Sequence, residues 1–282
     1  MILHVAEHAL LDSLKILPFL LLTYLAIELI EHHAEEKTVA LINQAGRFGP
    51  VIGGALGAIP QCGFSTATAN LYAGGLITRG TLLAVFLSTS DEMLPILISN
   101  SMPLDFILKI LLFKALAGML AGFLLDGFER RFMSPRHRHI HDMCEEEGCR
   151  CEDGVLKSAL RHTLKIFLFI FAVSFLLGLA VESVGHERLA AFILNRPVLG
   201  ELLAGLIGLI PNCAASVVIT QLYLQGGMSL GAMLAGLLTG SGVGLLVLFR
   251  MEHNWKSSLQ TLCILYLSGV TLGLIGGILP IF

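Results

Sequence analysis

Charged residues are scarce in this sequence. Only 14% of its 282 residues are Asp, Glu, Lys or Arg, against about a quarter in typical soluble domains. Hydrophobic residues make up 55% of the chain, and its mean hydropathy is +0.80. A soluble domain this apolar would lack the polar surface needed to face water. The composition therefore excludes an ordinary soluble protein and predicts an all-α integral membrane protein with several spanning helices.

Two other absences narrow the function. The six cysteines form no disulfide framework, because three lie in apolar segments and three crowd one polar stretch. The sequence contains no P-loop, so ATP hydrolysis by this chain is not expected. We predict no enzyme activity, no tightly bound cofactor and no nucleic-acid partner; the expected partners are the lipid bilayer and a transported ion.

The chain repeats itself at an offset of 151 residues. Residues 49–90 align with residues 200–241 without a gap, and 15 of the 42 positions are identical. Matched proline, cysteine, tyrosine and serine residues in one register are unusual for chance similarity between apolar segments. The sequence therefore predicts a first membrane repeat over 1–127, a linker over 128–161 and a second membrane repeat over 162–282.

Each repeat is predicted to contain about five helices: a long helix, two short apolar pieces and two further spanning helices. They cover about 12–32, 47–59, 63–76, 80–99 and 104–126 in the first repeat, and 163–182, 198–210, 214–227, 231–250 and 259–280 in the second. The short pieces, interrupted at Pro60 and Pro211, either re-enter the membrane or form two thin helices. Both arrangements give an odd number of crossings, so the repeats should have inverted topology.

The distribution of basic residues agrees with inverted repeats. The linker carries seven Lys and Arg residues and is predicted to be cytoplasmic by the positive-inside rule. Both termini are then external, whereas parallel repeats would put both ends of the chain inside. Inverted topology also assigns to the inner side the basic residues Lys37, Arg47, Arg79, Arg250 and Lys256.

The paired interruptions are the first candidate site. Inverted-repeat transporters bind their substrates near the bilayer midplane, at broken helices in corresponding positions. Each Pro-x-Cys segment here offers an amide, a thiol and a hydroxyl, and thiolates select soft metals. The alternative is that the cysteines only pack as small hydrophobic side chains. The candidate ligands are Gln61, Cys62, Ser65, Asn70, Asn212, Cys213, Ser216 and Gln221.

Two acidic residues form the second candidate. Asp91 and Glu92 interrupt an apolar stretch, and the second repeat has Gly242 and Val243 at the equivalent positions. An ionisable residue inside the membrane is costly and usually functional. We predict that Asp91 or Glu92 carries a proton or binds the cation, with Lys114 as a candidate partner. The alternative is that both face water at the outer interface.

The linker is the third candidate. It combines three histidines and three cysteines within 15 residues: His137, His139, His141, Cys144, Cys149 and Cys151. Nitrogen and sulfur donors at this density suit capture of transition metals. No zinc-finger spacing is present, so a mobile cytoplasmic collector is predicted rather than a folded module. The alternative is a solvated polar linker.

The segments PQCGFS (60–65), STSDEMLP (88–95) and PNCAAS (211–216) resemble a prokaryotic family of ten-helix heavy-metal exporters. Its members are also described as arsenic efflux proteins and as manganese transporters. The resemblance covers nearly the whole chain and implies an exporter of the inner (cell) membrane with five helices in each half. The cysteine pair fits arsenite or a soft cation, whereas Asp91, Glu92 and the amides fit Mn²⁺ better.

We therefore predict a secondary transporter that exports a heavy-metal or metalloid ion by alternating access, with the ion bound at the repeat interface between Cys62 and Cys213. A Mn²⁺ transporter is the nearest alternative. A membrane-embedded thiol redox enzyme, in which the two cysteines form and break a disulfide, is the alternative of another class. Glycine pairs at 118 and 122 and at 269 and 273 permit close helix packing, either in a homo-oligomer or within one protomer.

Overall fold

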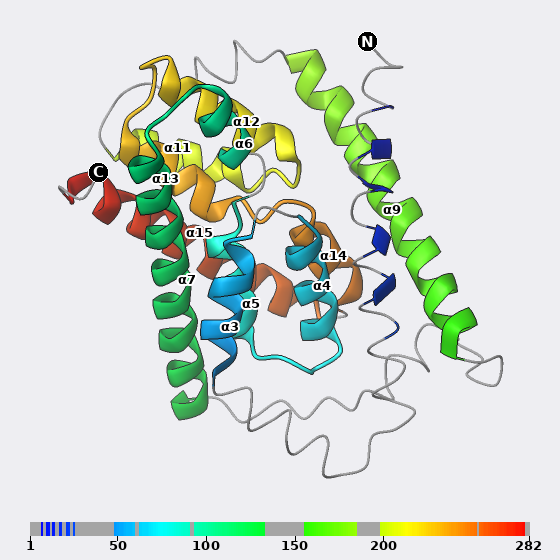
Figure 1. Cartoon of the computed structure of the whole chain (residues 1–282). Helices are drawn as coiled ribbons and strands as arrows, with labels where there is room; N and C mark the ends of the chain where they lie inside the picture. Colours follow the sequence, from blue (N-terminus) through cyan, green and yellow to red (C-terminus); the bar gives the residue numbers. More distant parts are fainter. Residues whose placement is uncertain are drawn as a thin grey trace.

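The computed structural model is helical throughout the part of the chain that it describes (Figure 1). It describes residues 48–59, 62–90, 93–132, 155–184, 198–252 and 254–279, together with ten isolated positions between residues 7 and 25. The first predicted helix, over 12–32, falls mostly outside these ranges. Within these described ranges, four helical segments are long and apolar enough to cross a membrane: Arg79–Ser99, Leu104–Arg131, Leu230–Met251 and Trp255–Ile278.

In the described residues, the helices α3 to α7 of the first half recur in the same order as α11 to α15 of the second half, which also contains α9. The first half has α3 (Gly49–Gly57), α4 (Cys62–Ala73), α5 (Arg79–Ser88), α6 (Met93–Ser99) and α7 (Leu104–Phe132). The second half has α9 (Val155–Val184), α11 (Leu199–Gly208), α12 (Cys213–Leu224), α13 (Leu230–Thr239), α14 (Gly244–Met251) and α15 (Trp255–Ile278). The helices α4 to α7 begin 151 residues before α12 to α15, which is the offset of the sequence repeat.

The spans predicted over 80–99 and 231–250 are present, but each consists of two helices separated by a break that the sequence analysis did not predict. In the first half α5 ends at Ser88, where the side chains of Ser88 and Thr89 donate hydrogen bonds of 2.7 Å to carbonyls one turn earlier. Such bonds compete with the helical backbone pattern. In the second half the break contains Gly242, whose φ of 56° lies in the left-handed region that glycine adopts without strain.

The turn that leads into each of these broken helices is the same in both halves. Gly75 and Gly226 have φ values of 73° and 74°, which explains why glycine recurs there. Thr78 and Ser229 then cap α5 and α13, each accepting a 3.1 Å hydrogen bond from the backbone N–H three residues later. Repeated sequence therefore corresponds to repeated local structure.

Glycine allows the helices within each half to pack closely. In the first half α3 and α7 pack against α5, and in the second half α11 and α15 pack against α13. A Cβ on Gly118 would lie 2.6 Å from the carbonyl oxygen of Ala84, and one on Gly273 would lie 2.5 Å from the backbone nitrogen of Ala235. The glycine pairs on α7 and α15 therefore serve contacts within one protomer.

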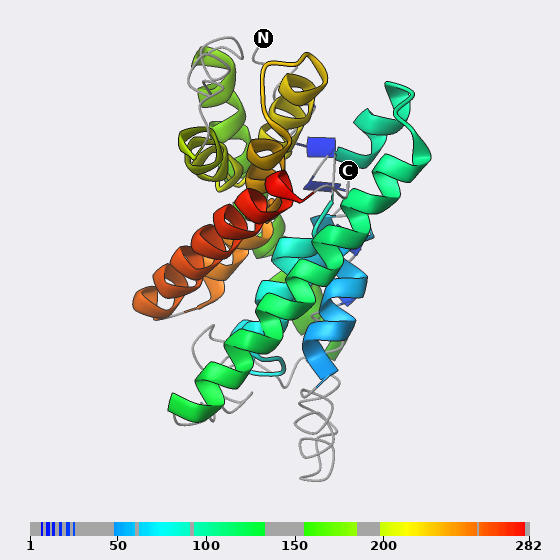
Figure 2. The ribbon, with the colours of Figure 1, turned by 90° about the vertical axis from the view of Figure 1, so that its left-hand side faces the viewer.

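The two halves contact each other reciprocally. The first half's α4 packs against the second half's α14, and the second half's α12 packs against the first half's α6. Reciprocal contacts between equivalent elements are the pattern that a two-fold axis produces. Figure 2 shows α7 descending from its first residue to its last, whereas its counterpart α15 rises.

Apolar side chains cover the outer face of α7. Exposed leucines recur there at every fourth position, which aligns them along one face of a helix. A continuous exposed apolar face of this kind suits contact with lipid rather than water. These residues are Leu104, Leu108, Leu112, Leu116 and Leu120.

Candidate functional site

A small cavity lies between the two halves. It is next to the breaks that follow α5 and α13 and next to the Pro-x-Cys segment of the second half. Its volume is about 20 Å³, enough for one water-sized occupant. Its walls come from the segments that follow α5 and α13, from the starts of α6 and α12, and from α7. The lining residues are Thr89, Ser90, Met93, Lys114, Gly208, Asn212, Ala215, Ser216, Leu237, Gly240 and Gly242.

Lys114 is the charged residue among the described residues of this lining. Its side chain has no solvent exposure, and its Nζ donates hydrogen bonds to the backbone carbonyl of Thr89 and, at 2.9 Å, to that of Leu237. These carbonyls lie at the ends of α5 and α13, where a helix has unsatisfied acceptors and partial negative charge. One ammonium group therefore joins the interrupted helices of the two halves.

The Pro-x-Cys segment of the second half contributes to the cavity. Pro211 and Asn212 lie between the end of α11 and the start of α12, and Asn212 and Ser216 are lining residues. Cys213 is the first residue of α12, although its side chain lies outside the described part of the chain. The amino-terminal end of α12, which carries partial positive charge, therefore borders the cavity.

The Pro-x-Cys segment of the first half has different surroundings. Cys62 begins α4, while Pro60, Gln61 and the side chain of Cys62 lie outside the described part. Ser65 is fully buried, and a Cβ on Gly244 would lie 2.8 Å from its Cβ. Gly244 is the repeat counterpart of Met93. Glycine allows α14 to pack closely against α4 in one half, whereas in the other half Met93 lines the cavity.

The remaining predicted ligands fall in three places. Asn70 is fully buried in α4, and Gln221 is exposed on α12; neither belongs to the cavity lining. Asp91 and Glu92 lie outside the described residues, between Ser90 and Met93, which both line the cavity. The residues that flank the two acids in the sequence therefore belong to the cavity lining.

The linker candidates can be located only by their flanking helices. Helix α7 continues to Phe132 and α9 begins at Val155, so helices extend into the predicted linker from both sides. Residues 137–151, with their histidines and cysteines, lie outside the described ranges. Among the residues that the structure describes, no group of three or more His, Cys, Asp or Glu side chains could hold a metal ion.

A buried polar network closes the end of the helix group next to the linker. Arg79 is 6% exposed and pairs with Glu129 on α7, with 2.7 Å between Nη1 and Oε1. Its Nη2 donates to Oγ of Ser257 on α15 at 2.9 Å, and its Nε donates to Oη of Tyr72 on α4 at 3.0 Å. Arg79 therefore connects three helices from both halves.

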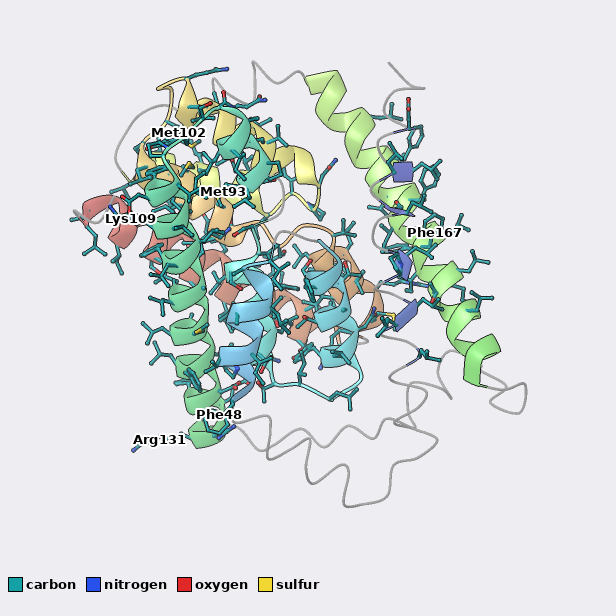
Figure 3. All side chains as sticks on the ribbon, viewed as in Figure 1. Phe48, Met93, Met102, Lys109, Arg131 and Phe167 are labelled. Atoms are coloured by element: carbon teal, nitrogen blue, oxygen red, sulfur yellow. The ribbon has the colours of Figure 1, made fainter. Side chains whose placement is uncertain are left out.

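An apolar contact occupies the equivalent position at the opposite end. The rings of Phe106 and Tyr223 stack with their centroids 5.9 Å apart. At the offset of 151 residues, Tyr223 corresponds to Tyr72 and Phe106 corresponds to Ser257. Figure 3 shows Arg131 and Phe48 at one end of the helix group, Met102 at the other and Met93 between them. The two ends are thus related by the repeat but differ in chemistry.

Sequence reasoning did not identify the contribution of Thr89, Ser90 and Met93 to the site. It named Lys114 only as a partner of the acids and placed the site between Cys62 and Cys213. The available signal was the identity of Ser90 and Ser241 at the end of the aligned region. In both halves, hydroxyl-bearing residues, joined by glycine in the second half, occupy the break between α5 and α6 and the break between α13 and α14.

Comparison with known proteins gives one match. The chain matches the ArsP_2 family, described as "Putative, 10TM heavy-metal exporter", over residues 5–193. No curated protein and no solved structure matches it. The matched region includes α3 to α7 and α9, about two thirds of the chain. The chain therefore belongs to the ArsP_2 family of multi-pass membrane proteins.

Proposed function

We propose that this protein is a secondary transporter that exports a heavy-metal or metalloid ion by alternating access, with the ion bound in the cavity between the two halves. The observation that carries this proposal is that the breaks after α5 and α13 and the Pro-x-Cys segment of the second half all line one cavity. Interrupted helices at the interface of two repeats are where secondary transporters bind their substrates. Backbone without helical hydrogen bonds is tolerated at membrane depth only inside protein or beside a cavity.

Three observations support inverted repeats. The counterparts α7 and α15 run in opposite directions in Figure 2, and the contacts between the halves are reciprocal. Arg79 bonds to Glu129 near the linker end of α7 and to Ser257, which follows Lys256. Basic residues from both halves therefore lie at this end. By the positive-inside rule this end is cytoplasmic, in a prokaryotic inner membrane, with both termini external.

The two closed ends supply the gates that alternating access needs. The Arg79 network forms the inner gate, and the stacked rings of Phe106 and Tyr223 form the outer gate. Each gate joins an element of one half to an element of the other, so rocking of the halves opens one gate without opening the other. The cavity lies between them.

The candidate ligands include both soft and hard donors, so they fit two kinds of ion. The thioether of Met93 in the lining favours a soft ion such as Cd²⁺ or arsenite. The thiols of Cys62 and Cys213, which we propose as further ligands, favour the same ions. The oxygen atoms of Ser90 and Ser216, together with Asp91 and Glu92, favour the harder Mn²⁺. We place the soft ion first because two cysteines recur at equivalent helix starts, and Mn²⁺ second.

The experiment that tests this function is uptake into inside-out vesicles of Mn²⁺, Zn²⁺, Cd²⁺ and arsenite, by wild type and by the Cys62→Ser/Cys213→Ser double variant. We expect soft-ion uptake that the double variant lowers at least about tenfold, since loss of one good ligand interaction costs about 1.4 kcal/mol or more. Mn²⁺ uptake that survives in the variant would support the second candidate. Uptake of none of the four ions would contradict export.

Coupling to protons is assigned to Asp91 and Glu92. Replacing them by Asn and Gln keeps their size but removes the groups that can carry a proton. We expect transport by Asp91→Asn/Glu92→Gln to lose its dependence on a pH gradient while the amount of folded protein stays close to wild type. Flux would be measured with and without an imposed gradient; an unchanged pH dependence would exclude both residues as carriers.

A further inference from the structure

The ends of α5 and α13 meet at a single group. Each helix leaves carbonyl oxygens without helical donors at its last turn, and the aligned peptide dipoles make both ends partly negative. Two such ends facing one another repel unless a positive charge lies between them. The Nζ of Lys114 lies there, bonded to the carbonyls of Thr89 and Leu237.

We infer that the carbonyl ends of α5 and α13 form a binding site for a monovalent primary-ammonium cation, which the protein fills with the side chain of Lys114. Carbonyl ends of interrupted helices bind cations in other transporter architectures. Here the cation is covalently attached, so the site is occupied whether or not the protein carries its transported ion.

The second half explains why one lysine is enough. The residue equivalent to Lys114 on α15 is Leu265, which is fully buried among apolar side chains. Because α5 and α13 end at the same place, one ammonium group neutralises both ends. A second lysine at Leu265 would bring an uncompensated charge into an apolar cluster, which is costly.

The contacts define the chemical class of the ligand. An ammonium group offers three N–H donors in a compact, strongly charged head, and two of its donors reach backbone carbonyls here. Two neutral carbonyl groups match a monovalent ammonium group, whereas divalent metals usually take more ligands, commonly with carboxylates or thiolates among them. A tetraalkylammonium ion has no N–H group and does not fit.

Occupation of these carbonyls by Lys114 affects where the transported ion binds, which rests on the proposed function. With the carbonyls of Thr89 and Leu237 bonded to Lys114, a transported ion binds other lining groups, such as those of Met93, Asn212 and Ser216. Lys114 is therefore a positioning residue that keeps external cations from these carbonyls and holds the two halves in register.

The test removes the attached cation and supplies a free one. Lys114→Ala retains Cβ and lacks the four atoms that propylammonium contains. We expect the purified variant to melt about 5–10 °C below wild type, because two helix ends lose charge-assisted hydrogen bonds. Propylammonium chloride should recover at least half of this loss, with saturating concentration dependence, whereas tetramethylammonium chloride and 1-propanol should not.

Two further variants make the result decisive. Leu265→Ala removes a buried side chain at the equivalent position of the second half, so it should be destabilised but unaffected by propylammonium. Lys114→Met fills the space without charge, and it should melt below wild type and show no recovery. A Met variant as stable as wild type, or an Ala variant that propylammonium does not stabilise more than Leu265→Ala, would overturn the inference. Melting requires no transport, so failure of export in the vesicle assay leaves this test intact.

Discussion

Replacing Gly118 by leucine should prevent α7 from packing against α5, and the variant should not accumulate as folded protein. A Cβ at this position would lie 2.6 Å from the carbonyl oxygen of Ala84. That oxygen belongs to the backbone of a buried helix, so it cannot rotate away as a side chain could. Overpacking of a core costs about 1–3 kcal/mol where neighbours can adjust, and this contact should exceed that range. Gel filtration of the detergent-solubilised, fluorescently tagged protein measures the folded fraction.

The same helix supplies the control. Among the described residues, nothing outside the adjoining helix backbone lies within 4 Å of a Cβ built on Gly127, which is exposed on α7 nine residues later. Gly127→Leu should give a symmetric elution peak of near wild-type size, because leucine also favours the helix more than glycine does. Equal loss of folded protein in both variants would attribute the effect to general intolerance of leucine rather than to contact between α7 and α5.

The helical repeat could be predicted because it depends on local sequence. Pro60 and Pro211 cannot continue a helix, and the expected short helices around them appear as α3, α4, α11 and α12. The interruption of the next helix was missed because hydropathy averages over a window. Leucine and isoleucine on both sides of Thr89 and Ser90 conceal a polar stretch of four or five residues, and the carbonyl contacts of these hydroxyls become visible only in the structure.

The site was harder to predict than the fold because it combines positions that are not equivalent in the repeat. Comparing the halves pairs Ser65 with Ser216 and Ser90 with Ser241. The cavity instead joins Ser90 of the first half to Ser216 of the second, a consequence of the crossing between α6 and α12. Lys114 has leucine as its counterpart, so repeat matching assigns it no importance; its role follows from two backbone carbonyls distant in sequence.

The Arg79 network also escapes sequence analysis, because its members are spread over the chain from Tyr72 to Ser257. Arg79 is buried, while Glu129 is 24% exposed, so the pair lies at the border between protein interior and solvent. Removing one partner of a buried ion pair leaves an uncompensated charge. The network should therefore hold the inner gate closed most firmly when all of its contacts are made.

Glu129→Gln should open the inner gate more often. In a cysteine-free background carrying Ser216→Cys, a membrane-impermeant maleimide applied to inside-out vesicles reports access to the cavity. Labelling should accelerate at least about tenfold, which corresponds to about 1.4 kcal/mol less stabilisation of the closed gate. The emission of Trp255, the single tryptophan of the chain, should shift in parallel because it lies two residues before Ser257.

The control removes another ion pair from the same helix. Asp105 and Lys109, one turn apart at the start of α7, form an ion pair of 2.8 Å and are more exposed than Arg79 and Glu129. Exposed ion pairs contribute little to stability. Asp105→Asn should leave both labelling and Trp255 emission unchanged. Faster labelling of the Glu129 variant only from the external face would assign the network to the outer gate and reverse the proposed orientation. No change from either face would show that the ion pair does not control access, so that Tyr72 and Ser257 alone would have to hold Arg79 and the two halves together.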